Sequence, residues 1–394
     1  MNLDQPFRRY LAPTTDTPIA LTFAKAKGIY IFDLEGNKYM DMISGIGVAN
    51  IGHSHPSVIA AVHKQVDSHM HLMVYGEYIQ QKQVTYAESL SKVLSQKLQC
   101  IYWVNSGTEA TEGAFKLAKR TTGRSEIISF KGSYHGSTLG SLSAMGNEKF
   151  KRAFRPLVPG HRQLIYNDLK HLDEITTNTA AVIVECIQAG SGYIQGTKEF
   201  LRKLSKICSE KGAMLIIDEC QTGFGRTGEL FAHQLYGVNP DILCLGKALG
   251  GGLPLGAFIS SQANMKKLSR EPMLGHITTF GGNPVSCAAG QAAFEVLINS
   301  GWMDLVTTLG DYIRRALIKH PRIININGQG LLIALVLDSP NSAIRIQKKL
   351  ISRRIITNFF LFNDSALRLT PPICIKKAEL NHFIKNIIEA LDEL

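Results

Sequence analysis

The middle of the chain alternates short apolar runs with longer segments of helical period. The runs are CIYWVN, EIISF, AAVIVE, AMLIIDE and DILCLG. Continuous apolar strands that alternate with helices predict an α/β fold, in which helices sandwich a mostly parallel sheet. Ligands of such sheets bind at the carboxyl ends of the strands. We therefore expect one edge of the sheet to gather the polar residues that end or follow these runs: Asn105, Tyr134, His135, Glu185, Asp218, Glu219 and Lys247.

The two ends of the chain have a different pattern. Residues 1–50 contain a turn-rich strand region, GIYIFDLEGNKYMDM, and amphipathic helices with a few strands follow from about residue 290. We expect a small α+β domain built from residues 1–50 and 289–394, beside a large domain of residues 51–288. The last segment predicts a helix that packs on the core through one apolar face, formed by Leu380, Phe383, Ile384, Ile387 and Leu391.

The composition is that of an ordinary globular protein, and the charge is distinctly positive. Of 394 residues, 45% are hydrophobic and 19% are charged, with a formal net charge of +11. The basic residues come as scattered pairs rather than as one run, which favours a solvated surface over a nucleic-acid-binding face. A positive field also favours small anionic substrates and phosphates.

The cysteines and the apolar runs bear on the cellular location. Seven cysteines with no close pairing and no C-x-x-C motif indicate reduced thiols. The start of the sequence, MNLDQPFRRYLAPTTDTP, lacks the apolar core of a signal peptide. No apolar run approaches the ~20 residues that a membrane helix needs. We expect a soluble cytoplasmic protein that does not associate with membranes.

A possible phosphate site opens the segment NSGTEATEGAFKLAKR. Ser106 and Glu109 have the spacing of a capping box at the start of an amphipathic helix. Gly107 and Thr108 then lie in the first turn, where free N–H groups and the helix dipole favour an anion, best of all a phosphate. A well-capped helix that binds nothing explains the same residues equally well.

Two histidine-containing loops carry weaker signals. In GSYHGS, Tyr134 could stack on a flat ring, although a Tyr-His pair in a loop also serves packing. His53 and His55 in GHSHP have no third ligand at a recognisable spacing. We therefore expect no metal site.

Asp218 and Lys247 are charged residues at the ends of apolar strands. A buried carboxylate is costly unless it is paired, and the partner of Asp218 is either a cationic ring nitrogen, a protein arginine or a helix N-terminus. Gln221, three residues on, could donate to a ring oxygen. Lys247 lies between an apolar run and three glycines, where an isolated ammonium loses hydration. Either its amine reaches water or it is bound covalently.

The stretch GFGRTG formally matches the G-x-G-x-x-G fingerprint of dinucleotide-binding proteins. It begins some residues after its strand rather than at the strand end, and no acidic ribose ligand follows about 20 residues later. The match therefore gives little support to an NAD-binding oxidoreductase.

A phosphate cradle, a stacking aromatic ring, a buried acid and a desolvated lysine are together the needs of one cofactor, pyridoxal 5′-phosphate. An imine between Lys247 and the aldehyde of this cofactor removes the isolated ammonium.

The sequence resembles the class III aminotransferases, which are fold type I pyridoxal-phosphate enzymes of the ornithine and acetylornithine aminotransferase group. The resemblance covers nearly the whole chain. Its motifs are FDLEGNKYMDMISGIGVANIGHSHP, NSGTEA, LIIDECQTGFGRTG, GKALGGGLPLGA, TTFGGNP and LRLTPP.

The resemblance implies roles for individual residues. Lys247 is the Schiff-base lysine and proton shuttle, and Asp218 is the partner of the pyridine nitrogen. Arg368 holds a substrate carboxylate, with Glu185 also in the substrate site. Thr279 reaches the cofactor phosphate of the neighbouring subunit, which implies a homodimer. The remaining cofactor-binding residues are Gly107 and Thr108 at the phosphate, Tyr134 on the ring and Gln221 beside the ring hydroxyl.

Two departures from the family pattern concern the substrates. Ser137 replaces an arginine that helps to hold the amino donor, and Gly190 replaces a glutamate that can pair with the carboxylate-binding arginine. We expect transfer of an amino group from ornithine, N-acetylornithine or a similar ω-amino donor to 2-oxoglutarate. The alternatives are transfer from an ω-amino acid or an amine to pyruvate, an NAD-binding oxidoreductase, and a nucleic-acid-binding module.

Overall fold

A seven-stranded sheet forms the centre of the computed structural model, which describes residues 3–394. Its strands, in spatial order, are β4 (Cys100–Val104), β12 (Gly256–Ser260), β11 (Ile242–Leu245), β10 (Met214–Asp218), β7 (Thr179–Val184), β5 (Glu126–Phe130) and β6 (His161–Leu164). Strands β11, β10, β7, β5 and β6 run parallel, whereas β12 is antiparallel to both of its neighbours. The predicted α/β fold with a mostly parallel sheet is confirmed.

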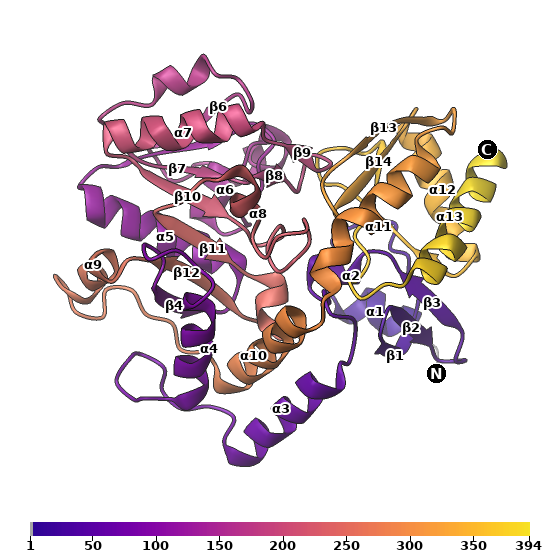
Figure 1. The fold of residues 1–394 in the computed structure, drawn as a ribbon, viewed down its shortest axis with the longest axis horizontal. Coiled ribbons are helices and arrows are strands. Elements are labelled where there is room, and N and C mark those ends of the chain that lie inside the picture. Colours follow the sequence, from indigo (N-terminus) through magenta and orange to yellow (C-terminus); the bar gives the residue numbers. More distant parts are fainter. Residues whose placement is uncertain (1–2) are drawn as a thin grey trace.

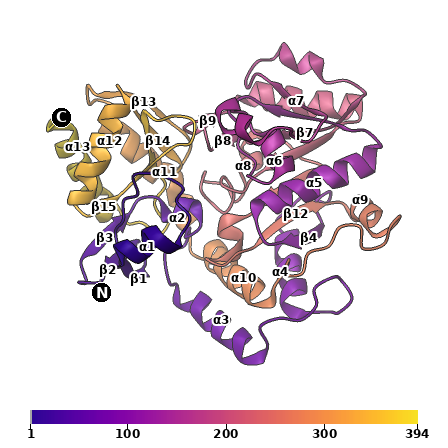
Figure 2. The same cartoon turned by 180° about the vertical axis from the view of Figure 1, so that it is seen from behind.

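Helices cover both faces of this sheet, because alternate side chains of each central strand enter different cores. On β10, Met214 and Ile216 pack in the cluster that includes α5 (Gly107–Thr122). Leu215 and Ile217 pack instead in the cluster that includes α7 (Lys198–Lys211). Helix α7 covers the face seen in Figure 1, and α5 covers the opposite face, seen in Figure 2. A strand buried on both sides reads as a continuous apolar run.

Two smaller sheets lie beside the large one, on the side where both chain ends are found (Figure 1). One contains β1 (Phe23–Lys27), β2 (Tyr30–Asp33), β3 (Lys38–Asp41) and β15 (Ile355–Ile356). The other contains β13 (Ile323–Asn327), β14 (Ile333–Leu337), β17 (Ala366–Leu369) and β16 (Asn358–Phe359). Strand β15 pairs in parallel with β3, with Ile355 opposite Met40, so the two ends of the chain share one sheet. The domain limits drawn from the sequence stay a prediction.

The C-terminal helices cover these smaller sheets. They are α11 (Trp302–Leu317), α12 (Pro340–Ser352) and α13 (Lys377–Asp392). The apolar face predicted for α13 is confirmed, since all five of its named side chains are buried.

The other elements are connections or flanking helices. They are α1 (Asp4–Tyr10), α2 (Ser44–Gly47), α3 (Pro56–Ser68), α4 (Gln81–Ser91), α6 (Leu139–Ala144), α8 (Ala232–Tyr236), α9 (Gln262–Met265), α10 (Pro284–Asn299), β8 (Ile187–Gln188) and β9 (Ile194–Gln195). Within residues 3–394, no helix has both the length and the apolar character needed to cross a bilayer. The seven cysteines are unpaired. A cytoplasmic location stays a prediction.

Candidate active site

A cavity of about 790 Å³ opens between the carboxyl ends of the large sheet and the strands β16 and β17. It brings together all but one of the site residues expected from the sequence: Gly107, Thr108, Tyr134, Glu185, Asp218, Gln221, Lys247 and Arg368. The exception is Thr279, which is exposed on the loop before α10 and does not line the cavity of its own chain.

The start of α5 forms one end of the cavity. Ser106 caps the helix by accepting a hydrogen bond from the Glu109 N–H at 3.3 Å, and the Glu109 carboxylate in turn accepts from the Asn105 N–H at 2.6 Å. The first N–H groups of a helix have no partner within the helix and carry the positive end of its dipole. This end of the cavity is therefore built to hold an anion.

Gly107 is required here by a close approach of two chain segments. A Cβ atom at this position would lie 2.6 Å from the Sγ atom of Cys220, which follows the Asp218 strand. Thr108 is held from its other side, because its hydroxyl bonds with those of Thr138 and Ser141, both at 2.8 Å. The anion cradle thus packs closely against the loop after Asp218 and is hydrogen-bonded to the segment that precedes and begins α6.

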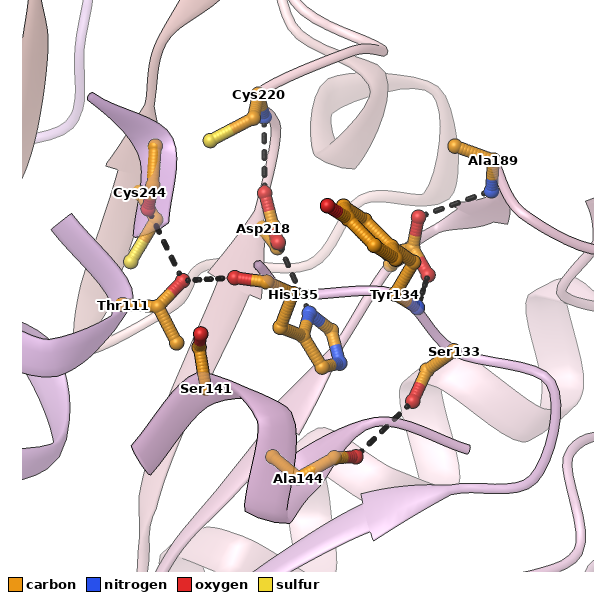
Figure 3. Close-up of polar contacts among 12 residues, drawn as sticks. Thr111, Ser133, Tyr134, His135, Ser141, Ala144, Ala189, Asp218, Cys220 and Cys244 are labelled. Carbon is orange, nitrogen blue, oxygen red and sulfur yellow. Dashed lines mark hydrogen bonds and ion pairs between the residues drawn. The ribbon is translucent and has the colours of Figure 1, made fainter. Parts of the chain in front are cut away.

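Asp218 ends β10 and is only 6% exposed. Its carboxylate accepts hydrogen bonds from His135 Nδ1 at 2.9 Å and from the Cys220 N–H at 3.0 Å (Figure 3). Because a carboxylate can only accept, the proton of this pair lies on Nδ1. Burial alone raises the pKa of Asp218, but the bonds and charge of His135, the Cys220 amide and the nearby Lys247 outweigh it and hold that pKa below its usual value.

His135 lies in the cavity at the sheet edge where the sequence placed it, but its role there was missed. We interpreted its loop as a place for a stacking tyrosine or for packing, whereas the buried imidazole is the direct partner of Asp218. The available signal was its position after a strand of the same sheet, which predicts that it lies at the same edge as Asp218 but not that the two residues are bonded. Strand β7 lies between β5 and β10, so no local pattern relates the two residues.

Glu185, just after β7, ties two loops of the cavity wall together. Its carboxylate accepts from the Tyr134 N–H at 3.0 Å and from the Ala189 N–H at 2.9 Å, and Figure 3 shows Tyr134 beside these contacts. Burial raises the pKa of Glu185 to about 7, the nearby Asp218 charge adds to the rise, and His135 opposes it. The Tyr134 hydroxyl bonds with the Ser137 hydroxyl at 3.0 Å. In this position Ser137 orients the aromatic ring and supplies no charge.

Lys247 lies two residues after the end of β11, at the start of a short 3-10 turn. Its backbone has φ +49°, in the left-handed region that a lysine seldom adopts. Such conformations persist where the surroundings impose them, and they are common at functional sites. Lys247 lowers the pKa of Asp218 through its charge, so both residues act at the same end of the cavity.

Arg368 lies at the opposite end, on β17, and is 5% exposed. Its guanidinium carbon is 4.7 Å from the centre of the Phe360 ring and 5.9 Å from that of Tyr193. Within residues 3–394 no carboxylate pairs with it, and its Nε has no hydrogen-bond partner. A buried charge without a counterion is costly, and a carboxylate that enters the cavity would supply the missing partner.

Gly190, which lines the same cavity, has no room for a side chain. A Cβ atom there would lie 2.7 Å from the Phe362 ring, and the Phe362 N–H donates to the Gly190 carbonyl at 3.0 Å. An aromatic ring therefore occupies the space in which the family pattern has a glutamate.

The residues at the end of the cavity formed by α5, Asp218 and Lys247 fit pyridoxal 5′-phosphate. The start of α5 suits its phosphate, the Asp218 carboxylate a cationic ring nitrogen, and Lys247 its aldehyde. These features define a pyridoxal-phosphate enzyme of fold type I.

The chain belongs to the class III aminotransferase family, whose model, Aminotransferase class-III, matches residues 11–391. It is 35% identical to the acetylornithine aminotransferase of Caldanaerobacter subterraneus over 399 residues, or 98% of each chain. It is also 35% identical to the putrescine aminotransferase of Pectobacterium atrosepticum over 381 residues, or 92% of this chain and 81% of that protein.

Solved structures agree with this assignment. The ornithine aminotransferase of Toxoplasma gondii superposes with a TM-score of 0.91 at 30% identity, covering 99% of this chain and 94% of that one. A second structure of that enzyme has PLP at partial occupancy at its active site. The cofactor of this chain is therefore pyridoxal 5′-phosphate, as is typical of the class III aminotransferases.

Proposed function

We propose that this aminotransferase moves an amino group from ornithine, N-acetylornithine or a similar ω-amino donor to 2-oxoglutarate. The observation that carries the proposal is Arg368, which is buried, has no paired carboxylate within residues 3–394 and lines the same cavity as Lys247 and Asp218. A bidentate pair of arginine and carboxylate recognises an oxo acid by both charge and geometry. The names of the similar acetylornithine and ornithine aminotransferases support the choice of donor.

The bound cofactor supplies an electron sink for the carbon that loses its proton. Lys247 accepts that proton at Nζ and returns it at the end of the half-reaction. Asp218 keeps its negative charge toward the ring nitrogen, and His135 holds it in place. At an effective dielectric near 20, a carboxylate and a cationic ring nitrogen 4 Å apart attract each other by on the order of 4 kcal/mol before the cost of desolvation is subtracted.

The other residues of the site hold and orient the cofactor and the substrate. The N–H groups at Gly107 and Thr108 would bind the phosphate, Tyr134 would cover the ring, and Gln221 would lie beside the ring hydroxyl. Glu185 supports the wall of the substrate site through the backbone amides of Tyr134 and Ala189.

The protein acts as a homodimer in this proposal, with Thr279 reaching the phosphate of the neighbouring subunit. Exposed apolar side chains on two loops support such an interface, among them Met70, Leu72, Ile79, Met273, Leu274, Ile277 and Phe280. The loops are joined, since the ring centres of His71 and Phe280 are 5.0 Å apart. Thr278, next to Thr279, accepts a hydrogen bond from the cavity residue Asn105 at 2.9 Å.

A second candidate function keeps the scaffold but uses an ω-amino acid or an amine as donor and pyruvate as acceptor. The bond between Ser137 and Tyr134, and the Phe362 ring against Gly190, both favour this alternative. They leave Arg368 as the cation for a substrate carboxylate and provide no second fixed charge beside it. The similar putrescine aminotransferase also fits this alternative.

A screen of half-reactions tests the proposal. The yellow, cofactor-loaded protein is mixed with ornithine, N-acetylornithine, putrescine, β-alanine or a simple amine, and loss of the visible absorbance is followed. We expect ornithine or N-acetylornithine to give the fastest loss, and 2-oxoglutarate to restore the colour better than pyruvate. Loss with simple amines alone would show that the proposed donor is wrong.

A further inference from the structure

Arg226 is a fully buried arginine that the proposed chemistry does not use. It lies in the GFGRTG loop, eight residues after Asp218, and has an exposed fraction of 0%. Its Nη2 donates to the Ser44 hydroxyl at 2.5 Å, and its Nη1 donates to the Pro371 carbonyl. Its own carbonyl accepts from the Leu331 N–H at 3.0 Å. One side chain thus joins the loop after β10 to the N-terminal segment and to the chain that leaves β17.

A chain of hydrogen bonds continues from Arg226 into the active-site cavity. The Ser44 hydroxyl donates to the Thr370 carbonyl at 2.5 Å. The Thr370 hydroxyl bonds with the Tyr193 hydroxyl at 2.8 Å. The Tyr193 hydroxyl also accepts a hydrogen bond from Gln221 Nε2 at 2.8 Å. Gln221 lines the cavity at the cofactor end.

The same contacts involve two neighbours of Arg368, the residue Thr370 and the ring of Tyr193. Thr370 follows two residues after Arg368, so a shift of the backbone at Thr370 or Pro371 moves the guanidinium as well. The Tyr193 ring, held through its hydroxyl, is one of the two aromatic rings against that guanidinium. Arg226 is therefore connected to the backbone that follows Arg368 and to the Tyr193 ring that packs against its guanidinium.

The turn that Arg226 holds is strained. Ser44 has φ +43° and Ile46 has φ +63°, both in the left-handed region, and Ile46 lines the cavity. Non-glycine residues in this conformation persist only where their surroundings impose it. Here the Asp41 carboxylate accepts from the Ile43 and Ser44 N–H groups, and Arg226 holds the Ser44 hydroxyl.

A role in stability alone does not explain Arg226 well. No carboxylate pairs with it within residues 3–394, and burial lowers its pKa to about 10. A buried cation without a counterion is costly, and apolar residues of similar volume are often as stabilising. The benefit of the arginine is that one rigid guanidinium offers donors to two chain segments at once, at Ser44 and at Pro371.

We propose that Arg226 is a positioning residue for the substrate carboxylate. It fixes the end of β17, and with it the Arg368 guanidinium, at a set distance from Lys247 and Asp218. The inference rests on the proposed role of Arg368 as the carboxylate-binding group.

The test measures carboxylate binding in the cofactor-loaded protein, with glutarate as a dicarboxylate that cannot react. The variants are Arg226→Met and Arg226→Lys. Thr370→Val, which removes one hydroxyl of the network, serves if the Arg226 variants fail to fold. Arg314→Met is the matched control, because Arg314 is a largely buried arginine on α11 outside the network.

We expect Arg226→Met to weaken glutarate binding by at least about tenfold, since a misplacement of about 1 Å can cost ~100-fold in a positioned site. Thr370→Val should show a smaller loss in the same direction. The KM for 2-oxoglutarate should rise with the Kd for glutarate, while the half-reaction with an amine that lacks a carboxylate slows less than threefold, roughly. Arg314→Met should leave glutarate binding unchanged.

Two outcomes overturn the inference, and Arg368→Ala separates them. If Arg368→Ala abolishes glutarate binding but folded Arg226 and Thr370 variants bind glutarate as the parent protein does, Arg226 has no positioning role. If Arg368→Ala leaves glutarate binding intact, the carboxylate site lies elsewhere, and the proposed function falls together with the inference.

Discussion

The two ends of the cavity differ in how their buried charges are matched. At the cofactor end, Asp218 has His135, a backbone amide and Lys247 around it. At the substrate end, Arg368 is buried to the same degree, yet it has aromatic rings and no anion as neighbours within the described chain.

This difference separates two tasks. A charge that must stabilise the cofactor ring in every half-reaction is paired and oriented in advance, so little reorganisation is needed during the reaction. A charge that must bind and release successive substrates gains from having no competitor inside the protein. The charge that stabilises the cofactor therefore lies at one end of the cavity, and the charge that selects the substrate lies at the other.

Removing the paired charge should have the largest effect. Asp218→Asn keeps the shape of the side chain but removes the negative charge, and we expect kcat to fall by roughly 10³-fold, as when a preorganised electrostatic group is lost. Stopped-flow measurement of the donor half-reaction reports this loss. Asp168→Asn is the matched control, because Asp168 pairs with His171 at 2.8 Å on the surface. A kcat within tenfold of the parent would contradict the role given to the cofactor end.

Removing the unpaired charge should have a smaller and more selective effect. Arg368→Ala should lower kcat/KM for 2-oxoglutarate by about 100-fold, in keeping with the loss of a buried charge-assisted pair. The rate with a carboxylate-free amine should change little. Arg322→Ala removes a surface arginine that pairs with Asp338, and it should alter neither rate. An equal loss of rate with 2-oxoglutarate and with the carboxylate-free amine would show that Arg368 supports the fold of the site and does not bind the carboxylate.

The smallest effect concerns Glu185 and the dependence of stability on pH. Because its pKa is raised in the folded protein, the native state binds more protons than the unfolded state between pH 4.5 and 7. Its contribution to the free energy of unfolding therefore falls as pH rises, by at most about 1.4 kcal/mol per pH unit. The substitution Glu185→Gln removes this pH-dependent contribution to the free energy of unfolding.

Urea unfolding of the cofactor-free protein at several pH values measures the effect. The stability of the parent relative to Glu185→Gln should decline from pH 4.5 toward 7. The exposed Glu210→Gln serves as control. Parallel curves for the parent and Glu185→Gln would contradict a raised pKa of Glu185 in the folded protein.

Much of the large sheet could be predicted from the sequence, because buried parallel strands are continuous apolar runs with polar residues at their ends. The antiparallel course of β12 could not be predicted from its composition. The only indication of the antiparallel course is the short connection between β11 and β12, which runs from Gly246 to Leu255. A crossover to a parallel strand needs a longer segment. The pairing of β3 with β15 has no local signal, because the partners lie more than 300 residues apart.

The candidate site divides in the same way. Residues at strand ends, such as Asp218 and Lys247, could be found because the topology gathers them at one edge. The contacts between His135 and Asp218, and between Phe362 and Gly190, depend on how separate loops pack. Whether Thr279 enters a neighbouring site depends on a second chain, and it stays a prediction.

The most direct test of the account is to locate the lysine that carries the cofactor. The cofactor-loaded protein is reduced with borohydride, digested and analysed by mass spectrometry. We expect a pyridoxyl group on Lys247, in the peptide that contains DILCLGK, and none elsewhere. Modification of a different lysine, or of none, would contradict it.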